Sequence, residues 1–295
     1  MNRTIFLFSA LTGLGLCWGL TIPLTRIAVL AGYKPFGLMA WQMIIVVVFT
    51  TIIMVVRGVR FPLSRQYMEL FLAIAFFGTL IPSFFSYTAA TGLPAGIAAI
   101  IIAFVPMFAM PIAVMAKLER WNLPRVTGLL LGAVAVILLA GPDALPTGIS
   151  WIFVALALVG PLAYALEANY LAWRGDGGLD AFSVLWGASI LGVLISVPAA
   201  IAQGQWIDPI KPWQGHDWAV LISGLVHCIA YTGYVWIVRQ AGSVFASQIA
   251  YLVTATGILW SMLLLGERYG LTVWIAFGLM MTGVALVKPR HTENA

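Results

Sequence analysis

Long runs of apolar residues, each about the length of a membrane-spanning helix, follow one another along almost the whole chain. A helix needs about 20 mostly apolar residues to cross the hydrocarbon core of a bilayer. Charges, Gly/Pro pairs and polar clusters divide the sequence into ten such runs. They cover residues 4–31, 36–56, 68–90, 94–117, 124–141, 149–173, 181–203, 217–239, 245–265 and 271–288. The pattern therefore predicts an all-α polytopic membrane protein with ten transmembrane helices.

The segments between these runs are too short and too apolar for a soluble domain. The longest, residues 203–217, places Trp206, Trp213 and Trp218 where aromatic residues gather at a membrane interface. Near the N-terminus, Arg3 is followed by a very long apolar stretch without a convincing small-residue cleavage site. This stretch is interpreted as the first spanning helix and not as a signal peptide.

Composition supports the membrane assignment. Of the 295 residues, 62% are hydrophobic and only 8% are charged, whereas soluble domains carry about 25% charged residues. The net charge of +5 does not indicate a nucleic-acid partner, because the basic residues are scattered in short loops. Cys17 and Cys228 both fall in apolar runs, which argues against a disulfide. No phosphate-binding loop is present, and no motif predicts a cofactor or a metal site.

The basic residues are divided unequally between the two sides of the predicted membrane. Ten spans place both termini on one side, and a cytoplasmic location for that side gives it most of the lysines and arginines. The cytoplasmic set is Arg3, Arg57, Arg60, Arg65, Lys117, Arg120, Arg125, Arg174, Arg239, Lys288 and Arg290. The opposite side holds only Lys34, Lys211 and Arg268. The positive-inside rule therefore predicts an inner-membrane protein, embedded in lipid, with both termini in the cytoplasm.

Two stretches of the chain read alike, FVPMFAMPIAVMAKLERW and LVTATGILWSMLLLGERY. An offset of 148 positions aligns the pair Glu119–Arg120 with the pair Glu267–Arg268. Coincidence between two helix ends is the alternative, because Glu-Arg is common at a membrane boundary. Each stretch is followed by a short glycine-bearing helix, however, so the likeness favours an internal repeat.

The two motifs end the fourth and the ninth predicted spans, which are five spans apart. An odd number of spans in each half gives the halves opposite orientations in the membrane. This arrangement is typical of transporters with inverted repeats, whose substrate site lies near the midplane between the halves. The sequence thus predicts two inverted five-helix repeats, residues 1–145 and 146–295, in one integral membrane domain.

A family resemblance supports this interpretation. Pro106 followed by Glu119–Arg120, and the stretch CWGLTIPLTR at residues 17–26, resemble the EamA-type members of the drug/metabolite transporter superfamily. The whole sequence is most similar to its aromatic amino acid exporters, the YddG type. The second half departs from the pattern, since Thr254 stands where the first half has Pro106. The resemblance implies a basket in which spans 1–4 and 6–9 enclose a cavity and spans 5 and 10 support it.

Polar residues on one face of span eight are the most informative candidates for a binding site. Ser223, His227, Tyr231 and Tyr234 recur at spacings of four, four and three, which places them on one helical face. A helix–helix hydrogen bond that satisfies a buried imidazole is the structural alternative. Four polar or amphipathic groups in register exceed what one packing contact needs, so this face is predicted to line a hydrated cavity. Tyrosine rings there would stack on an aromatic solute.

Weaker candidates for the same cavity lie in other spans. They are Trp18, Gln42, Ser83, Tyr87, Tyr164, Gln248 and Tyr251. A second set, the prolines within spans, is expected to kink helices and provides candidate hinges. These prolines are Pro23, Pro82, Pro106, Pro111, Pro161 and Pro198.

Two charged residues fall within predicted spans. Glu167 lies about two turns from the cytoplasmic end of span six, and Tyr164 shares its face. Because facing lipid is costly for a carboxylate, Glu167 is expected either to line or gate the cavity or to hydrogen-bond a neighbouring helix. Arg26 lies near the outer end of span one. Snorkelling to the interface is the favoured interpretation of Arg26, with anion binding as the alternative.

These features together favour a secondary transporter that exports small amphipathic metabolites, foremost aromatic and other neutral amino acids, by alternating access. A multidrug exporter of the same fold is the nearest alternative. Proton coupling through His227 or Glu167 and uniport are equally compatible with the sequence, and homodimer formation is left open. An intramembrane hydrolase built on Ser189 and His227 is a distant alternative, because a G-x-S match in a glycine-rich chain is weak. No catalytic residue is therefore predicted. A purely structural membrane protein is the third class.

Overall fold

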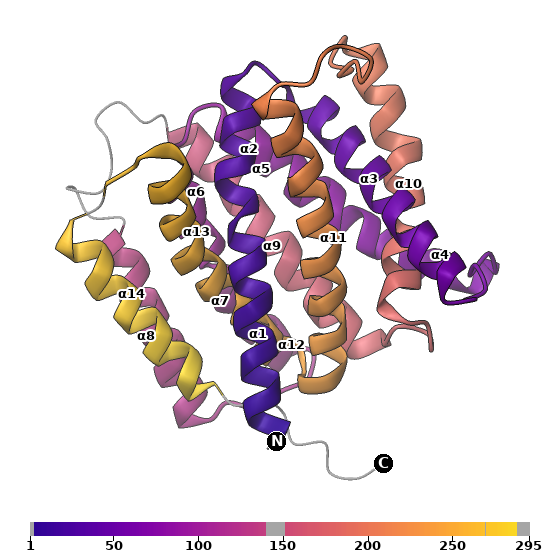
Figure 1. The fold of residues 1–295 in the computed structure, drawn as a ribbon. Helices are drawn as coiled ribbons and strands as arrows, with labels where there is room; N and C mark the ends of the chain where they lie inside the picture. The colour runs from indigo at the N-terminus through magenta and orange to yellow at the C-terminus, as the bar shows by residue number, and fades with distance from the viewer. Residues whose placement is uncertain (1–2, 140–150, 269, 288–295) are drawn as a thin grey trace.

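The computed structural model describes residues 3–139, 151–268 and 270–287, and within these ranges the chain contains helices and connecting loops but no strand. The predicted boundary between the repeats, at residues 145 and 146, lies outside the described residues. So do Lys288 and Arg290 of the predicted cytoplasmic set. The helices form one bundle in which most elements run along a common direction (Figure 1).

The first half of the bundle contains the following elements. They are α1 (Arg3–Gly19), α2 (Thr21–Leu30), α3 (Pro35–Val56), the 3-10 helix η1 (Arg65–Tyr67), α4 (Met68–Ala73), the π-helix η2 (Ile74–Leu80), α5 (Ile81–Ala90), α6 (Ala95–Ile102), α7 (Val105–Met115) and α8 (Leu123–Leu139). The second half contains α9 (Trp151–Arg174), α10 (Ala181–Ala202), α11 (Gly215–Ala241), α12 (Ser243–Ser247), α13 (Ile249–Leu265) and α14 (Leu271–Leu286).

Eight helical segments of the described chain are long and apolar enough to cross a membrane. Helices α8 and α14 are shorter apolar helices, so the count of ten spans stays a prediction. Large apolar side chains such as Val56, Leu63 and Met115 are more than three-quarters exposed. An outward surface of this kind suits lipid tails and not water. The protein is thus an integral membrane protein with an all-helical fold.

Three of the helical segments break next to a proline. A proline has no backbone N–H for the carbonyl four residues earlier, and its ring crowds that carbonyl. The break between α1 and α2 follows Gly19, four residues before Pro23, and α6 ends at Ile102, four residues before Pro106. The π-helix η2 precedes Pro82 in the same way. The other three prolines predicted to kink helices lie within α7, α9 and α10, which are continuous.

The two halves of the chain pack in matching ways. Adding the offset of 148 to the bounds of α3 gives 183–204, close to those of α10, and the same step carries α8 onto α14. These corresponding helices pack against each other, α3 on α10 and α8 on α14. The packing of α1 on α13 corresponds to the packing of α9 on α6 and α7. Likewise, the packing of α11 on α2 corresponds to that of α5 on α9. The packing is therefore pseudo-symmetric, as expected for an internal repeat.

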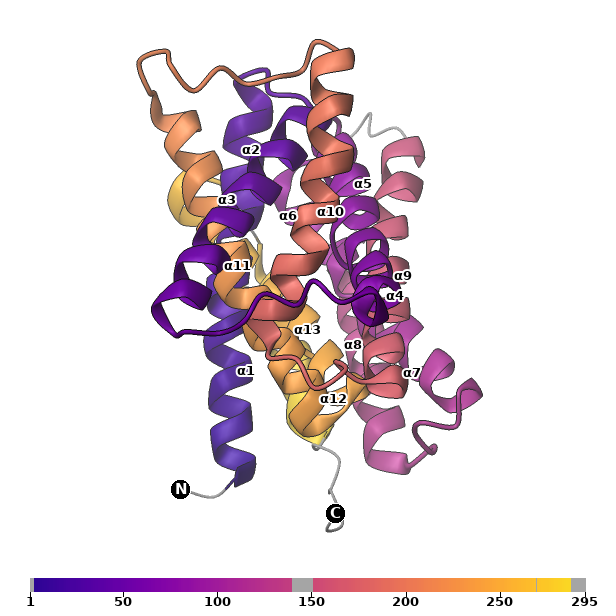
Figure 2. The same ribbon diagram turned by 90° about the vertical axis from the view of Figure 1, so that its right-hand side faces the viewer.

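Corresponding helices also run in opposite directions. Arg3 at the start of α1 donates a hydrogen bond of 2.8 Å to the carbonyl of Gln240, near the end of α11. Next to it, Arg239 pairs with Asp176, just after the end of α9, at 3.0 Å. The start of α1 and the end of α9 therefore share one end of the bundle, which we call the lower end (Figure 1). The upper end carries the loop of residues 203–214 between α10 and α11 (Figure 2).

Aromatic and polar contacts hold this upper loop against the bundle. The indole of Trp41 on α3 donates to the carbonyl of Ile207 at 2.9 Å. Lys211 of the loop pairs with Asp217 at 3.2 Å, and the Tyr33 hydroxyl donates to the same carboxylate. Burial, followed by the hydrogen bond to Asp217, raises the pKa of Tyr33 above its ordinary value of 10.0. Tyr33 therefore keeps its proton and acts as a donor at neutral pH.

Candidate functional site

A pocket with a cavity volume of about 130 Å³ lies in the upper part of the bundle. Seven helical segments contribute to its wall, namely α1 with α2, α3, α5, α6 with α7, α9, α11 and α13. The wall is mostly apolar, with side chains such as Ile101 and Val253, and carries a small number of polar groups. Pockets of this composition suit small amphipathic molecules, because apolar surface supplies affinity and the few polar groups fix orientation.

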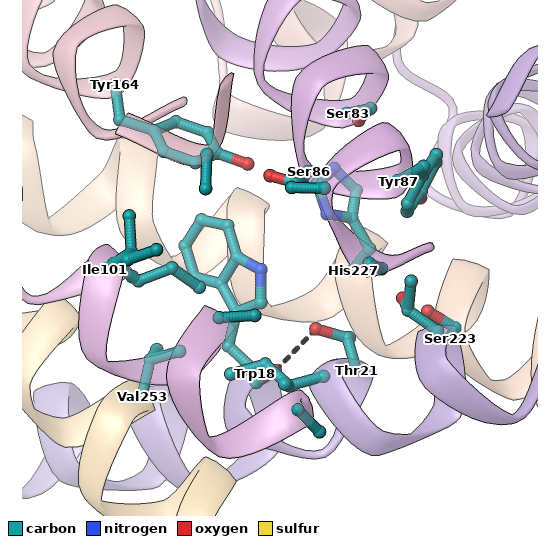
Figure 3. Close-up of a pocket in the computed structure, with 18 of the residues that line it drawn as sticks. Trp18, Thr21, Ser83, Ser86, Tyr87, Ile101, Tyr164, Ser223, His227 and Val253 are labelled. Atoms are coloured by element: carbon teal, nitrogen blue, oxygen red, sulfur yellow. Dashed lines mark hydrogen bonds between the residues drawn. The ribbon is translucent and has the colours of Figure 1, made fainter. Parts of the chain in front are cut away.

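The indole of Trp18 stands at the centre of an aromatic cluster in this pocket (Figure 3). Its ring centroid lies 6.2 Å from that of Tyr164 and 5.8 Å from that of Tyr234, both in edge-to-face geometry. The imidazole of His227 is 5.8 Å away. Trp18 lies at the end of α1, one residue before the Gly19 carbonyl that Pro23 leaves unbonded. The proline break thus sets where the indole enters the pocket.

Several polar groups face the same space. The Tyr87 hydroxyl on α5 donates to the amide oxygen of Gln42 on α3, and Ser83 and Ser223 also line the pocket. The Nε2 atom of His227 and the hydroxyl of Tyr234 are buried without a hydrogen-bond partner. Unpartnered buried polar atoms are costly, so a bound ligand or water that satisfied these two would bind favourably.

Arg26 is the only charged residue among the described residues that line the pocket. Its guanidinium donates to the carbonyl of Ala90, at the end of α5. The guanidinium thus lies beside the end of α5 at the pocket wall, and its snorkelling to the interface stays a prediction. One hydrogen bond leaves most of the five guanidinium N–H donors available for other partners. Arg26 therefore supplies a positive charge at the pocket wall.

Eight of the twelve residues predicted from the sequence line this pocket. They are Trp18, Gln42, Ser83, Tyr87, Tyr164, Ser223, His227 and Tyr234. Gln248 and Tyr251 lie elsewhere, although both belong to the segment α12–α13. The amide of Gln248 donates to the carbonyl of Val244 at 3.2 Å, and the ring of Tyr251 packs where Gly132 of α8 leaves room for it.

The remaining two predicted residues, Glu167 and Tyr231, form a buried pair outside the lining. The Tyr231 hydroxyl on α11 donates to Oε1 of Glu167 on α9, and Oε2 of Glu167 has no partner. Glu167 is 1% exposed and Tyr231 is fully buried. Gly78 of the π-helix η2 lies against both side chains, and a Cβ atom at this position would overlap them. The hydrogen bond thus joins two helices of the second half, and Gly78 brings η2 of the first half against the pair.

Below this pair, further polar contacts join the helices to one another. The amide of Asn169 on α9 donates to the carbonyl of Ala109 on α7 at 3.0 Å. The Ser243 hydroxyl of α12 donates to the Asn169 side-chain oxygen at 3.0 Å. Tyr170 bonds Glu69 of α4 at 3.1 Å. Four helical segments are thus tied together at the lower end, while the pocket lies in the upper part.

The geometry does not support the hydrolase alternative. Ser189 is fully buried on α10, its hydroxyl has no hydrogen-bond partner, and it is absent from the pocket wall. His227 faces the pocket on α11. No Ser189–His227 dyad is therefore formed in the described chain. Among the described residues, no three His, Cys, Asp or Glu side chains lie together in a group that could hold a metal ion.

Sequence reasoning missed the apolar part of the wall. Ala157, Ile249 and Val253 line the pocket, but nothing in an apolar span distinguishes an alanine or isoleucine that faces a cavity from one that faces a helix. The hydrogen bond of Arg26 to the Ala90 carbonyl was also missed, because no local pattern indicates it.

Comparisons with known proteins agree with this architecture. The sequence matches the model of the EamA-like transporter family twice, over residues 5–141 and 149–288. It is 23% identical over 284 residues to the uncharacterized inner membrane transporter YedA of Escherichia coli (strain K12), covering 95% of the chain and 90% of the relative. It is 24% identical over 278 residues to the probable terminal-alkyne amino-acid exporter of Streptantibioticus cattleyicolor, covering 92% and 90%.

A solved crystal structure has the same fold. It matches with a TM-score of 0.73 and covers 96% of both chains at 19% sequence identity. Identity at this level supports the fold and carries no statement about substrate.

Proposed function

Because the chain belongs to the EamA-like transporter family, within the drug/metabolite transporter superfamily, we propose that it exports neutral amino acids, aromatic ones foremost. The protein is a membrane transporter, and the proposal concerns its substrate and direction. The observation that carries it is the pocket that combines the aromatic cluster around Trp18 with the single cation of Arg26.

The chemistry of the pocket suits an amino acid. The guanidinium of Arg26 pairs with the substrate carboxylate, because Arg recognises carboxylates through two parallel N–H···O bonds. An aromatic substrate side chain packs on the edge-to-face cluster formed by Trp18, Tyr164 and Tyr234. The unpartnered Nε2 of His227 and hydroxyl of Tyr234 are hydrogen-bond partners for the substrate's ammonium group.

Two observations favour amino acids over hydrophobic drugs. A positive charge at the pocket wall repels the cationic compounds that many drug exporters carry, and it attracts a carboxylate. The relative from Streptantibioticus cattleyicolor is named as a probable amino-acid exporter. A multidrug exporter of the same fold remains the competing function, and the substrate screen described below separates the two.

Transport follows from alternating access. The pocket lies in the upper part of the bundle, and the lower end is closed by the contacts of Asn169, Tyr170 and the Glu167–Tyr231 pair. With both termini in the cytoplasm and the protein in the inner membrane, as the distribution of basic residues predicts, this arrangement faces outward. The breaks beside Pro23, Pro82 and Pro106 provide the hinges at which helix ends move to open the lower end.

The test is a substrate screen with purified protein in liposomes. Vesicles are loaded with one unlabelled compound, and the entry of the same compound in labelled form is measured by exchange. The compounds are phenylalanine, tyrosine, tryptophan, leucine, lysine and a cationic drug. The proposal predicts exchange with the three aromatic amino acids and none with the drug. Exchange with the drug alone establishes the competing function.

The Arg26→Gln variant tests the carboxylate assignment. The variant loses one charge-assisted interaction of about 1.5–3 kcal/mol. This loss raises the phenylalanine concentration that gives half-maximal exchange by roughly ten- to a hundredfold. Arg120→Gln is the matched control, because Arg120 is exposed and lies outside the pocket. Equal half-saturation for Arg26→Gln and the wild type would remove Arg26 from substrate recognition.

A further inference from the structure

Glu167 is a carboxylate in an unusual position for a membrane protein. It lies near the middle of the bundle, 1% exposed, between the pocket and the closed lower end. Its printed hydrogen bond comes from the Tyr231 hydroxyl, and Oε2 has no partner. Ionisable residues at membrane depth are costly and usually mark an ion or proton pathway. The position of this carboxylate therefore needs a specific explanation.

No fixed cation neutralises Glu167. The titratable groups that interact with it are Tyr231 and Tyr234 from α11 and Tyr164 from its own helix, and His227 stacks on Tyr231. By sequence, η2, α5, α6, α7 and α12 contain no lysine or arginine. Helix α11 carries one arginine, Arg239, which pairs with Asp176. A buried charge without a counter-charge is strongly unfavourable, so the buried form of Glu167 is the protonated acid.

The pair is linked to the substrate pocket through rings in contact. Trp18, which lines the pocket, lies 6.2 Å from the ring of Tyr231. Tyr231 in turn stacks on His227 at 5.6 Å, and its hydroxyl holds Glu167. A substrate that packs on Trp18 therefore acts on the same tyrosine that binds the acid. Gly78 of η2 lets the Tyr231 hydroxyl and the Glu167 carboxyl lie against its backbone, because it has no side chain.

We propose that Glu167 is the proton site that couples amino acid export to proton entry, and this inference rests on the proposed export function. With a proton on Glu167, the pair with Tyr231 closes the lower end without an unpaired charge. The substrate-free protein turns inward-facing with this proton bound, and the proton leaves to water in the cytoplasm once the lower end is open. Substrate then binds against Trp18 from the cytoplasm, and the proton-free protein returns to the outward-facing arrangement, releases the substrate and takes a new proton from outside. One proton enters for each amino acid that leaves, and no covalent bond is made or broken apart from the O–H bond of the acid.

Accumulation driven by a pH gradient tests the proposal in vesicles of purified protein. The membrane potential is clamped with potassium and valinomycin, and the interior is made one pH unit more acidic than the outside. One-for-one antiport then accumulates labelled phenylalanine about tenfold. The Glu167→Gln variant has no proton to release, and it is expected to keep exchange at equal pH but to lose accumulation. Asp208→Asn is the matched control, an exposed carboxylate in the loop between α10 and α11 that is absent from the pocket wall, and it should keep both.

The outcomes separate coupling from substrate. Wild-type exchange without pH-driven accumulation overturns coupling and leaves the export function standing. Accumulation of phenylalanine by Glu167→Gln also overturns the assignment. The assignment fails as well if His227→Gln loses accumulation while Glu167→Gln keeps it. Failure of the wild type to exchange any amino acid refutes the export function and the coupling with it.

A measurement on the wild type keeps the test valid if Glu167→Gln does not fold. A pH-sensitive dye inside vesicles without an imposed gradient reports protons that leave as phenylalanine enters. The proposal predicts a rise of internal pH on addition of phenylalanine, and Glu167→Asp should preserve it because the acid remains. No change of internal pH during measured phenylalanine entry would refute coupling.

Discussion

A methyl group at position 78 provides a sensitive test of the contact between the two halves of the bundle. Gly78 lies in the π-helix η2, and the Cβ of an alanine there would overlap the Tyr231 hydroxyl and the Glu167 carboxyl. Alanine gains up to about 1 kcal/mol over glycine in a helix. Overpacking costs about 1–3 kcal/mol, and displacement of the Tyr231–Glu167 hydrogen bond costs about 0.5–1.5 kcal/mol. The net prediction for Gly78→Ala is a loss of roughly 1–3 kcal/mol in the free energy of unfolding.

The assay is equilibrium unfolding of the purified protein in detergent, followed by circular dichroism. Gly13→Ala is the matched control, because nothing lies within 4 Å of a Cβ built on Gly13 of α1. This control is expected to be neutral or more stable by up to about 1 kcal/mol. Combining Gly78→Ala with Tyr231→Phe removes the atom nearest to the new methyl group and should recover part of the loss.

Two results would refute the reasoning. The first is a Gly78→Ala protein as stable as Gly13→Ala, which would mean that Glu167 and Tyr231 do not lie against η2. The second is a double variant whose loss equals the sum of the single losses, since independent sites add and contacting sites do not.

Three further perturbations test other parts of the account. Trp18→Ala removes edge-to-face contacts of about 0.5–1.5 kcal/mol each. The phenylalanine concentration for half-maximal exchange should rise about tenfold or more, and an unchanged concentration contradicts the aromatic site. Asn169→Leu removes the hydrogen bond to the Ala109 carbonyl and leaves the Ser243 hydroxyl without its acceptor, and it should cost about 1–3 kcal/mol in detergent unfolding. An unaltered midpoint argues against these contacts. Burial raises the pKa of Tyr33 above 10.0, so the unfolded chain loses that proton first and stability falls as the pH rises past 10. Tyr33→Phe should flatten that fall, and an identical pH profile would remove Tyr33 as its cause.

The sequence predicted the helical segments well because apolar runs and charged loops report directly on membrane depth. Its ten runs match the helices closely, and α11 begins at Gly215 where residue 217 was expected. The proline prediction held only in part. Pro23, Pro82 and Pro106 adjoin breaks, whereas Pro161 lies inside the continuous α9, because packing on both sides of a helix can hold it together despite one missing hydrogen bond.

The site was predictable only where periodicity selects a face. The spacing of Ser223, His227 and Tyr234 placed all three on the pocket wall, but the same spacing could not reveal that Tyr231 turns to Glu167. That contact depends on the meeting of α9, α11 and η2, which no local pattern encodes. Gln248 was predicted to line the cavity but lies outside this pocket for a similar reason, because a break after α12 directs its side chain to the local backbone.

The bound position of phenylalanine tests the central claim most directly. An electron cryomicroscopy structure of the protein with saturating phenylalanine is predicted to show the ligand in the upper pocket. Its carboxylate should lie within hydrogen-bond distance of Arg26 and its ring against Trp18. Phenylalanine bound outside this pocket, or a pocket left empty at saturation, would contradict the assignment of an amino acid transport site.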